Sequence, residues 1–182
     1  MSETRTNGTL VVGGARSGKS RFAEDLALRS GLAKVYVATG TAFDGEMERR
    51  IAAHRDRRGM GWRTVEEQTD LVSVLAREAG PGAVLLVDCL TLWLNNLMMA
   101  ERDLAAESAR LCDAVTALAG PCVFVSNEVG MGIVPDNRLS REFRDAQGRL
   151  NQDMAAVCGK VVFVAAGQPL LLKPNQQPDI SL

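Results

Sequence analysis

The amino-acid sequence predicts an α/β fold, with a mainly parallel sheet flanked by helices in a single domain. Short apolar, β-branched runs alternate with helical patterns along the chain, which is the order that successive βαβ units produce. The chain has 182 residues, of which 46% are hydrophobic, and this suits one globular domain with a continuous core. We therefore expect one domain over residues 1–182, with flexible tails at 1–8 and 174–182.

Several strand candidates are apolar on consecutive residues, as strands buried on both faces should be. The candidates are Thr9–Val12, Lys34–Ala38, Trp62–Glu66, Ala83–Asp88, Cys122–Ser126, Lys160–Ala165 and a short edge segment, Leu170–Lys173. Helical patterns fill the intervals over Lys19–Ser30, Leu71–Ala79, Cys89–Met99, Asp103–Leu118 and Ser140–Val157. Each of these helices is expected to cover the sheet.

Composition excludes several classes of protein. The formal net charge is −1, which gives no electrostatic basis for binding nucleic acid. No stretch reaches the roughly 18 apolar residues of a membrane span, and the N-terminal segment lacks the pattern of a signal peptide. The scattered cysteines, Cys89, Cys112, Cys122 and Cys158, have no CxxC spacing and are expected as reduced thiols. We expect a cytoplasmic protein.

A glycine-rich loop, GGARSGKS, occupies Gly13–Ser20 between a predicted strand and a predicted helix. In such a P-loop the glycines let backbone amides curl round phosphates, the lysine reaches the β and γ oxygens, and the final hydroxyl holds Mg²⁺. A chance glycine-rich turn is the alternative, and the strand and helix on either side disfavour it. The triphosphate-binding residues are therefore Gly13, Gly14, Ala15, Arg16, Ser17, Gly18, Lys19 and Ser20. The fold is expected to be P-loop NTPase-like.

A carboxylate for the magnesium ion is expected at the end of a neighbouring strand. The segment Ala83–Asp88 reads AVLLVD, so an apolar strand runs directly into Asp88. We expect Ser20 and Asp88 to hold Mg²⁺. Aspartate is also a common helix cap, so a cap on the next helix is the alternative role, and both roles are compatible.

His54 is the one histidine of the chain. Helical spacing places Met47, Ile51 and His54 on one face, which by itself favours a histidine packed against the core. Three arginines follow at once: Arg55, Arg57 and Arg58. Guanidinium groups suit phosphate oxygens, although a solvated charged face would show the same composition.

The segment from Asn127 to Gly132 leaves a predicted strand and turns on two glycines. This position predicts that it lines the same crevice as Asp88. An ordinary strand-to-helix loop is the alternative.

Five stretches of the sequence together resemble one family over nearly the whole chain. They are LVVGGARSGKSRFAE, YVATGTAFDGEM, RIAAHRDRRGMGWRTVEE, LLVDCLTLWLNNL and SNEVGMGIVPDNRLSREFRDAQGRLNQ. The last is too long and particular to arise from generic P-loop architecture. The sequence resembles the bifunctional adenosylcobinamide kinase / adenosylcobinamide-phosphate guanylyltransferases of cobalamin biosynthesis.

The resemblance implies two reactions. ATP or GTP phosphorylates adenosylcobinamide, and GMP from GTP is then transferred to adenosylcobinamide phosphate, giving adenosylcobinamide-GDP and pyrophosphate. It makes His54 the nucleophile that carries GMP, in place of a packed side chain. It assigns further nucleotide or metal contacts to Ala38, Thr39, Gly40, Arg55, Asp56, Arg57, Arg58, Glu66 and Asp88. It also implies a homotrimer whose neighbouring subunits complete the site.

Two other functions fit part of the pattern. A simple P-loop kinase for another small alcohol would leave His54 structural. A nucleotide-dependent switch would need no second substrate, but the NKxD-type guanine motif of GTPase switches is missing from the sequence.

Overall fold

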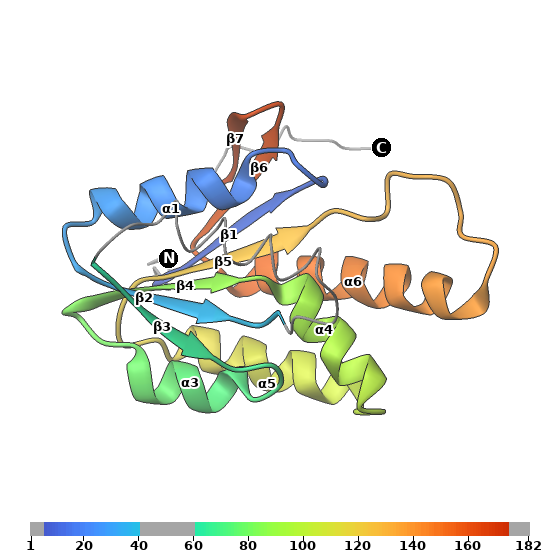
Figure 1. Cartoon of the computed structure of the whole chain (residues 1–182), viewed down its shortest axis with the longest axis horizontal. Coiled ribbons are helices and arrows are strands. Elements are labelled where there is room, and N and C mark those ends of the chain that lie inside the picture. Colours follow the sequence, from blue (N-terminus) through green and yellow to red (C-terminus); the bar gives the residue numbers. More distant parts are fainter. Residues whose placement is uncertain (1–5, 41–60, 175–182) are drawn as a thin grey trace, which may run out of the picture.

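The computed structural model describes residues 6–40 and 61–174. Its strands form one sheet in the order β3-β2-β4-β5-β1-β6-β7 (Figure 1). The strands are β1 (Gly8–Gly13), β2 (Ala33–Ala38), β3 (Trp62–Glu66), β4 (Ala83–Asp88), β5 (Cys122–Asn127), β6 (Lys160–Ala165) and β7 (Gln168–Lys173). All neighbouring strands are parallel except β6 and β7. The predicted α/β class with a mainly parallel sheet is confirmed.

Helices cover both faces of this sheet (Figure 1). They are α1 (Lys19–Arg29), α3 (Leu71–Glu78), α4 (Leu90–Met99), α5 (Leu104–Thr116) and α6 (Arg138–Val157). Buried apolar residues of α1 pack on one face, and those of the other four helices pack on the opposite face, while the partly buried Leu92 of α4 packs on the α1 side. Within residues 6–40 and 61–174, none of the helices has the length and apolar character needed to cross a membrane.

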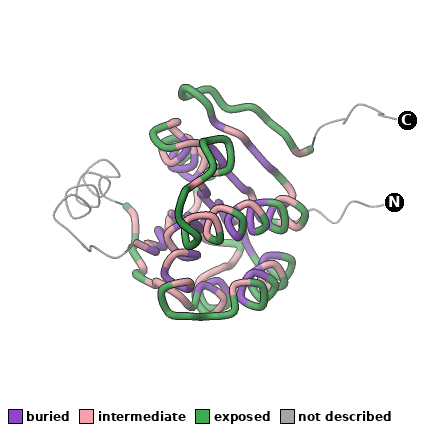
Figure 2. The backbone as a smooth tube through the Cα atoms, turned by 90° about the vertical axis from the view of Figure 1, so that its right-hand side faces the viewer, coloured by how far each residue is buried: buried purple, intermediate pink, exposed green. Residues whose placement is uncertain are grey.

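The core has two layers because successive strand residues point to opposite faces of the sheet. In β1, Val11 packs with Ala23 and Ala27 of α1. Its neighbours Leu10 and Val12 join the larger cluster under the other helices. Figure 2 shows the buried residues gathered along the strands and the helix sides that face them.

Side-chain caps explain where three helices begin. Asp70 accepts a hydrogen bond from the amide of Ser73 at the start of α3, and Asp103 accepts from two amides at the start of α5. Asn137 accepts from the amide of Ser140, so α6 begins at Arg138, two residues before the predicted start.

Residues 6–8 contact the folded part of the chain, although a flexible tail is expected over 1–8. Gly8 already belongs to β1. The Thr6 hydroxyl donates to the carbonyl of Val157 at 2.6 Å, and the Asn7 side-chain amide donates to the carbonyl of Leu118 at 2.8 Å. Residues 6–8 are therefore fixed to the body of the domain, while residues 1–5 and 175–182 lie outside the described ranges.

The strand that ends in Asp88 is not hydrogen-bonded to the strand that precedes the phosphate loop, Gly13–Ser20. Instead β5 lies between β4 and β1, so the expectation of neighbouring strands is corrected. Residue patterns identify strands but do not encode their order in the sheet. In the observed register Gly13 pairs with Asn127 and Asp88 pairs with Val125.

Candidate active site

The phosphate loop connects β1 to α1 at the carboxyl edge of the sheet. The amide of Ser17 donates to the carbonyl of Gly14 at 3.3 Å, which closes the turn. Gly18 caps α1 with a φ of 96°, a left-handed conformation that favours glycine. No side chain caps this helix end, so the first amides of α1 are suited to accept an anion.

Two loop glycines are required by close packing. A Cβ on Gly13 would lie 2.4 Å from the carbonyl oxygen of Val164 and 2.6 Å from the Ser17 hydroxyl. A Cβ on Gly18 would lie 3.1 Å from the Cα of Gly167. The amide of Gly167 also donates to the carbonyl of Ser17 at 2.8 Å. The turn between β6 and β7 therefore supports the loop, a role that the sequence motif did not reveal.

Lys19 is buried and folds back over the loop. Its Nζ donates to the carbonyl of Gly14 at 3.0 Å. Ala15 and Arg16 lie exposed at the tip of the loop. The ammonium group and the first amides of α1 thus bring positive charge to the same short segment.

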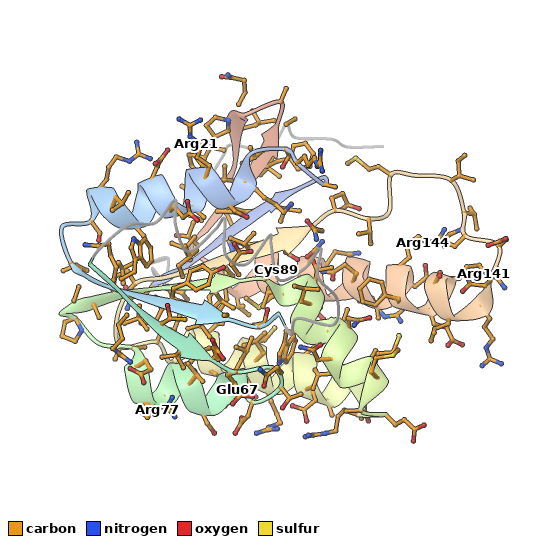
Figure 3. All side chains as sticks on the ribbon, in the orientation of Figure 1. Arg21, Glu67, Arg77, Cys89, Arg141 and Arg144 are labelled. Carbon is orange, nitrogen blue, oxygen red and sulfur yellow. The ribbon has the colours of Figure 1, made fainter. Side chains whose placement is uncertain are left out.

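Asp88 is the last residue of β4, and the N-cap of α4 is the following residue, Cys89. The alternative that Asp88 caps α4 is therefore wrong. Burial, together with the charge of Asp88, raises the pKa of Cys89 to about 11, and the charge of Lys19 opposes part of that rise. Lys19 and Asp88 both lie within electrostatic reach of Cys89, which is labelled in Figure 3. The fold thus brings the loop lysine and the strand-end carboxylate to one region.

The donor chemistry at this edge fits a nucleotide-bound magnesium ion. Ser20 offers a hydroxyl from the first turn of α1, and Asp88 offers a carboxylate. Mg²⁺ commonly takes one or two protein oxygens and fills its other positions with phosphate oxygens and waters. Among the described residues no group of three or more His, Cys, Asp or Glu side chains gathers to hold a metal by itself. These donors suit an ion that arrives with the nucleotide.

The carboxyl end of β2 lies directly beside Asp88. Thr39 is fully buried, and its hydroxyl both donates to the carbonyl of Cys89 at 2.7 Å and accepts from the amide of Cys89 at 2.8 Å. Asn96 of α4 donates to the carbonyl of Thr39 at 2.8 Å. Thr39 therefore connects β2 to the start of α4. Its hydroxyl contacts among the described residues are to the backbone of Cys89, which they hold in place.

The other predicted contacts at this edge come from β2 and β3. Ala38 pairs with Asp88 on one side and with Glu66 on the other. Glu66 is exposed at the end of β3. Gly40 lies two residues after the end of β2, and a Cβ on it would lie 3.1 Å from a methyl group of Leu92. The structure thus brings Ala38, Glu66 and Asp88 to the carboxyl ends of three adjacent strands.

The predicted nucleophile and its charged neighbours lie outside the described residues. These are His54, Arg55, Asp56, Arg57 and Arg58. Their roles stay predictions.

The segment after β5 begins beside the phosphate loop. The amide of Glu128 donates to the carbonyl of Gly13 at 3.0 Å. Farther on the segment extends away from the sheet before α6 begins (Figure 1), and the Ile133 side chain is 97% exposed. The segment therefore starts from a strand that lies between β1 and β4, and its tip is exposed. That it lines one crevice with Asp88 stays a prediction.

The chain is similar to known proteins over most of its length. A family model described as cobinamide kinase / cobinamide phosphate guanyltransferase matches residues 9–172. The bifunctional adenosylcobalamin biosynthesis protein CobP of Pseudomonas aeruginosa is 51% identical over 166 residues, covering 90% of this chain and 96% of that protein. The proteins named CobU of Salmonella typhimurium and Escherichia coli are each 40% identical over 179 residues, covering 90% of this chain and 98% of their own length. The chain therefore belongs to the cobinamide kinase / cobinamide phosphate guanyltransferase family.

Proposed function

We propose that this member of the family of bifunctional cobalamin biosynthesis enzymes carries out both of the reactions named in the family description. It phosphorylates adenosylcobinamide with ATP or GTP, and it then transfers GMP from GTP to adenosylcobinamide phosphate through a guanylylated His54. The observation that carries the proposal is the phosphate loop at the carboxyl edge of the sheet, with Lys19 and Asp88 both near Cys89, in a chain that the family model covers from residue 9 to residue 172.

In the first reaction the substrate hydroxyl attacks the γ phosphorus and a nucleoside diphosphate leaves. Catalysis of phosphoryl transfer is mainly positioning and charge neutralisation. The loop amides and the Lys19 ammonium group serve both needs. Mg²⁺ held by Ser20 and Asp88 would neutralise charge on the phosphate oxygens when bound.

In the second reaction the His54 imidazole attacks the α phosphorus of GTP and pyrophosphate leaves. A phosphate oxygen of adenosylcobinamide phosphate then attacks the same phosphorus and releases the imidazole. A covalent intermediate divides one difficult transfer into two easier steps. Arg55, Arg57 and Arg58 supply guanidinium groups beside the nucleophile in the sequence.

The test is transfer of label from GTP that carries it on the α phosphate. The wild-type protein should become labelled without any corrinoid, because forming the intermediate needs only GTP, Mg²⁺ and the imidazole. A phosphoramidate bond breaks in acid and survives alkali, whereas phosphate esters of serine and threonine resist acid. His54→Ala should abolish both the label and guanylyl transfer while adenosylcobinamide is still phosphorylated.

Three results would contradict the proposal. Label that persists in His54→Ala would exclude His54 as the nucleophile. Phosphorylation without any protein label would support a simple kinase. Nucleotide turnover that does not respond to adenosylcobinamide would favour a switch.

A further inference from the structure

The strand between the phosphate loop and Asp88 ends in an asparagine that the reactions above leave without a role. Asn127 is the last residue of β5 and pairs with Gly13, the first residue of the loop. On the other side of β5, Val125 pairs with Asp88. Asn127 therefore lies at the carboxyl edge between the loop and the strand-end carboxylate.

Strand alternation indicates the face on which the Asn127 side chain lies. Ser126 faces α6, where its hydroxyl donates to the Asn151 side chain at 2.6 Å. Val125 packs on the opposite face, with Ala23 and Ala27 of α1. Because side chains alternate along a strand, Asn127 shares the face of Val125, where α1 follows the phosphate loop.

The same alternation applies to the two flanking strands. In β1 Val11 belongs to the α1 cluster, which puts position 13 on that face. In β4 Leu86 belongs to the same cluster, which puts Asp88 there too. Asn127, Asp88 and the start of the loop therefore share one face of the sheet.

Hydrogen bonds on both sides hold the backbone of Asn127. Its amide donates to the Thr91 hydroxyl at 2.9 Å, and its carbonyl accepts from the Asn151 side chain at 3.0 Å. Gln147 donates to the Ser126 hydroxyl at 2.9 Å and to Asn151 at 3.1 Å, which fixes Asn151 in turn. The backbone from which the Asn127 side chain projects is therefore fixed before any ligand binds.

Within the described residues the hydrogen bonds of Asn127 are those of its backbone, the side-chain amide makes none, and the residue is partly exposed. The carboxylate of the next residue, Glu128, accepts from the amide of Gly130 at 2.6 Å and so lies against its own loop. Of these two side chains only that of Asn127 carries a hydrogen-bond donor, and no described residue accepts from it.

We propose that Asn127 is a catalytic residue of phosphoryl transfer, whose side-chain amide donates a hydrogen bond to an oxygen of the γ phosphoryl group. This role rests on the proposed kinase function. The substrate hydroxyl oxygen forms the new bond to the γ phosphorus, and the bond from phosphorus to the β–γ bridging oxygen breaks, its electron pair leaving with the nucleoside diphosphate. The hydroxyl proton passes to solvent. Asn127 exchanges no proton and stabilises charge on the transferring group.

The test compares Asn127→Ala and the isosteric Asn127→Asp with wild type in two separate assays. Loss of one donor to the transition state should lower kcat for adenosylcobinamide phosphorylation by about 10²- to 10³-fold, with little change in KM. Asn127→Asp should lose at least as much, because it replaces a donor with negative charge. Guanylyl transfer to supplied adenosylcobinamide phosphate attacks the α phosphorus and should change only a few-fold in both variants. Asn95→Ala in α4 is the matched control and should retain both activities.

Distinct outcomes separate failure of this role from failure of the kinase function. A wild-type protein that does not phosphorylate adenosylcobinamide overturns both. An active wild type with a normal kcat in Asn127→Ala overturns the role of Asn127 alone, as does a raised KM with unchanged kcat. Equal loss of both activities in Asn127→Asp would show that Asn127 supports the structure of the edge, and this too overturns a role at the γ phosphoryl group.

Discussion

Gly13 and Lys19 serve the phosphate loop for different physical reasons. Gly13 is glycine because the Val164 carbonyl and the Ser17 hydroxyl occupy the space that a Cβ would need. Lys19 contributes charge, and its Nζ is held over the loop by the carbonyl of Gly14. Replacing the first is expected to disturb the shape of the loop, while replacing the second removes the cation.

We predict that Lys19→Ala lowers both phosphorylation and guanylyl transfer by roughly 10²-fold or more, because both reactions use the same polyphosphate. Lys19→Met keeps the aliphatic stem and separates lost packing from lost charge, so it should be nearly as inactive. Asp88→Ala should impair both reactions as well. Rates are measured separately in the two assays, and a near-normal rate of either reaction in Lys19→Ala would rule out a shared site.

The cysteine thiols should be unreactive in the native protein. Burial raises the pKa of Cys89 and of Cys112 to about 11 and that of Cys158 to about 12, and it raises the pKa of Cys122 well above its usual value. Since the thiolate is the nucleophile, a pKa raised from 9.0 to about 11 lowers the reactive fraction about a hundredfold at pH 8. Titration with an aromatic disulfide reagent should be slow until denaturant is added, and the half-buried Cys112 should react first. Immediate reaction of all four thiols would contradict these shifts.

At the scale of elements, the joint between β2 and α4 is built from polar groups in an otherwise apolar layer. The Thr39 hydroxyl makes two hydrogen bonds to the backbone of Cys89, and Asn96 bonds to the carbonyls of Thr39 and Gln68. Trp93 of the same helix donates to the carbonyl of Thr69 at 2.7 Å. These bonds fix α4 against the ends of β2 and β3, where the nucleotide contacts are predicted.

We predict that Thr39→Val lowers the free energy of unfolding by about 1–3 kcal/mol, because it leaves the buried amide of Cys89 without its acceptor. Thr39→Ser keeps the hydroxyl and should lose less. Denaturant unfolding of the two variants and wild type provides the measurement. A Thr39→Val protein as stable as Thr39→Ser would show that the two hydrogen bonds contribute nothing net.

The elements themselves were largely predictable from the sequence. Strands such as Ala83–Asp88 were located to the residue, because a buried parallel strand is a continuous apolar run with polar residues at its end. The start of α6 was placed late because Asn137 was not recognised as its cap. The position of β5 between β1 and β4 was missed, because strand order depends on the path of the connections.

The parts of the candidate site that form a local residue pattern could be predicted, and those that depend on contacts between distant segments could not. The loop motif and Asp88 were visible as residue types at strand ends. The support of the loop by Gly167 was not, because a contact between segments far apart in the chain leaves no local pattern. The position of Asn127 next to Gly13 also depends on strand order.

For the molecule as a whole, the family resemblance predicts a homotrimer. The surface carries apolar side chains that a monomer would leave in water. Ile133 is 97% exposed on the segment after β5, and Leu170 is 59% exposed on β7, one of the two edge strands of the described sheet. Contacts between subunits would cover such residues.

We predict that light scattering gives a mass three times that of the 19.6 kDa chain. The trimer should persist on dilution to the concentrations used for activity assays, since neighbouring subunits are expected to complete the site. A strictly monomeric protein with full activity in both reactions would refute that expectation.

The position of β1 in the sheet also governs when the protein first becomes able to bind a nucleotide during its own synthesis. Gly8 of β1 pairs with Cys122 and Thr9 pairs with Lys160, so both partners of β1 come from the last third of the chain. A ribosome adding about 5–20 residues per second leaves β1 without either partner for on the order of ten seconds. Its apolar residues are open to chaperones or to other nascent chains during that time. A translation product that stops before β6 carries the phosphate-loop sequence without the strand and turn that shape it.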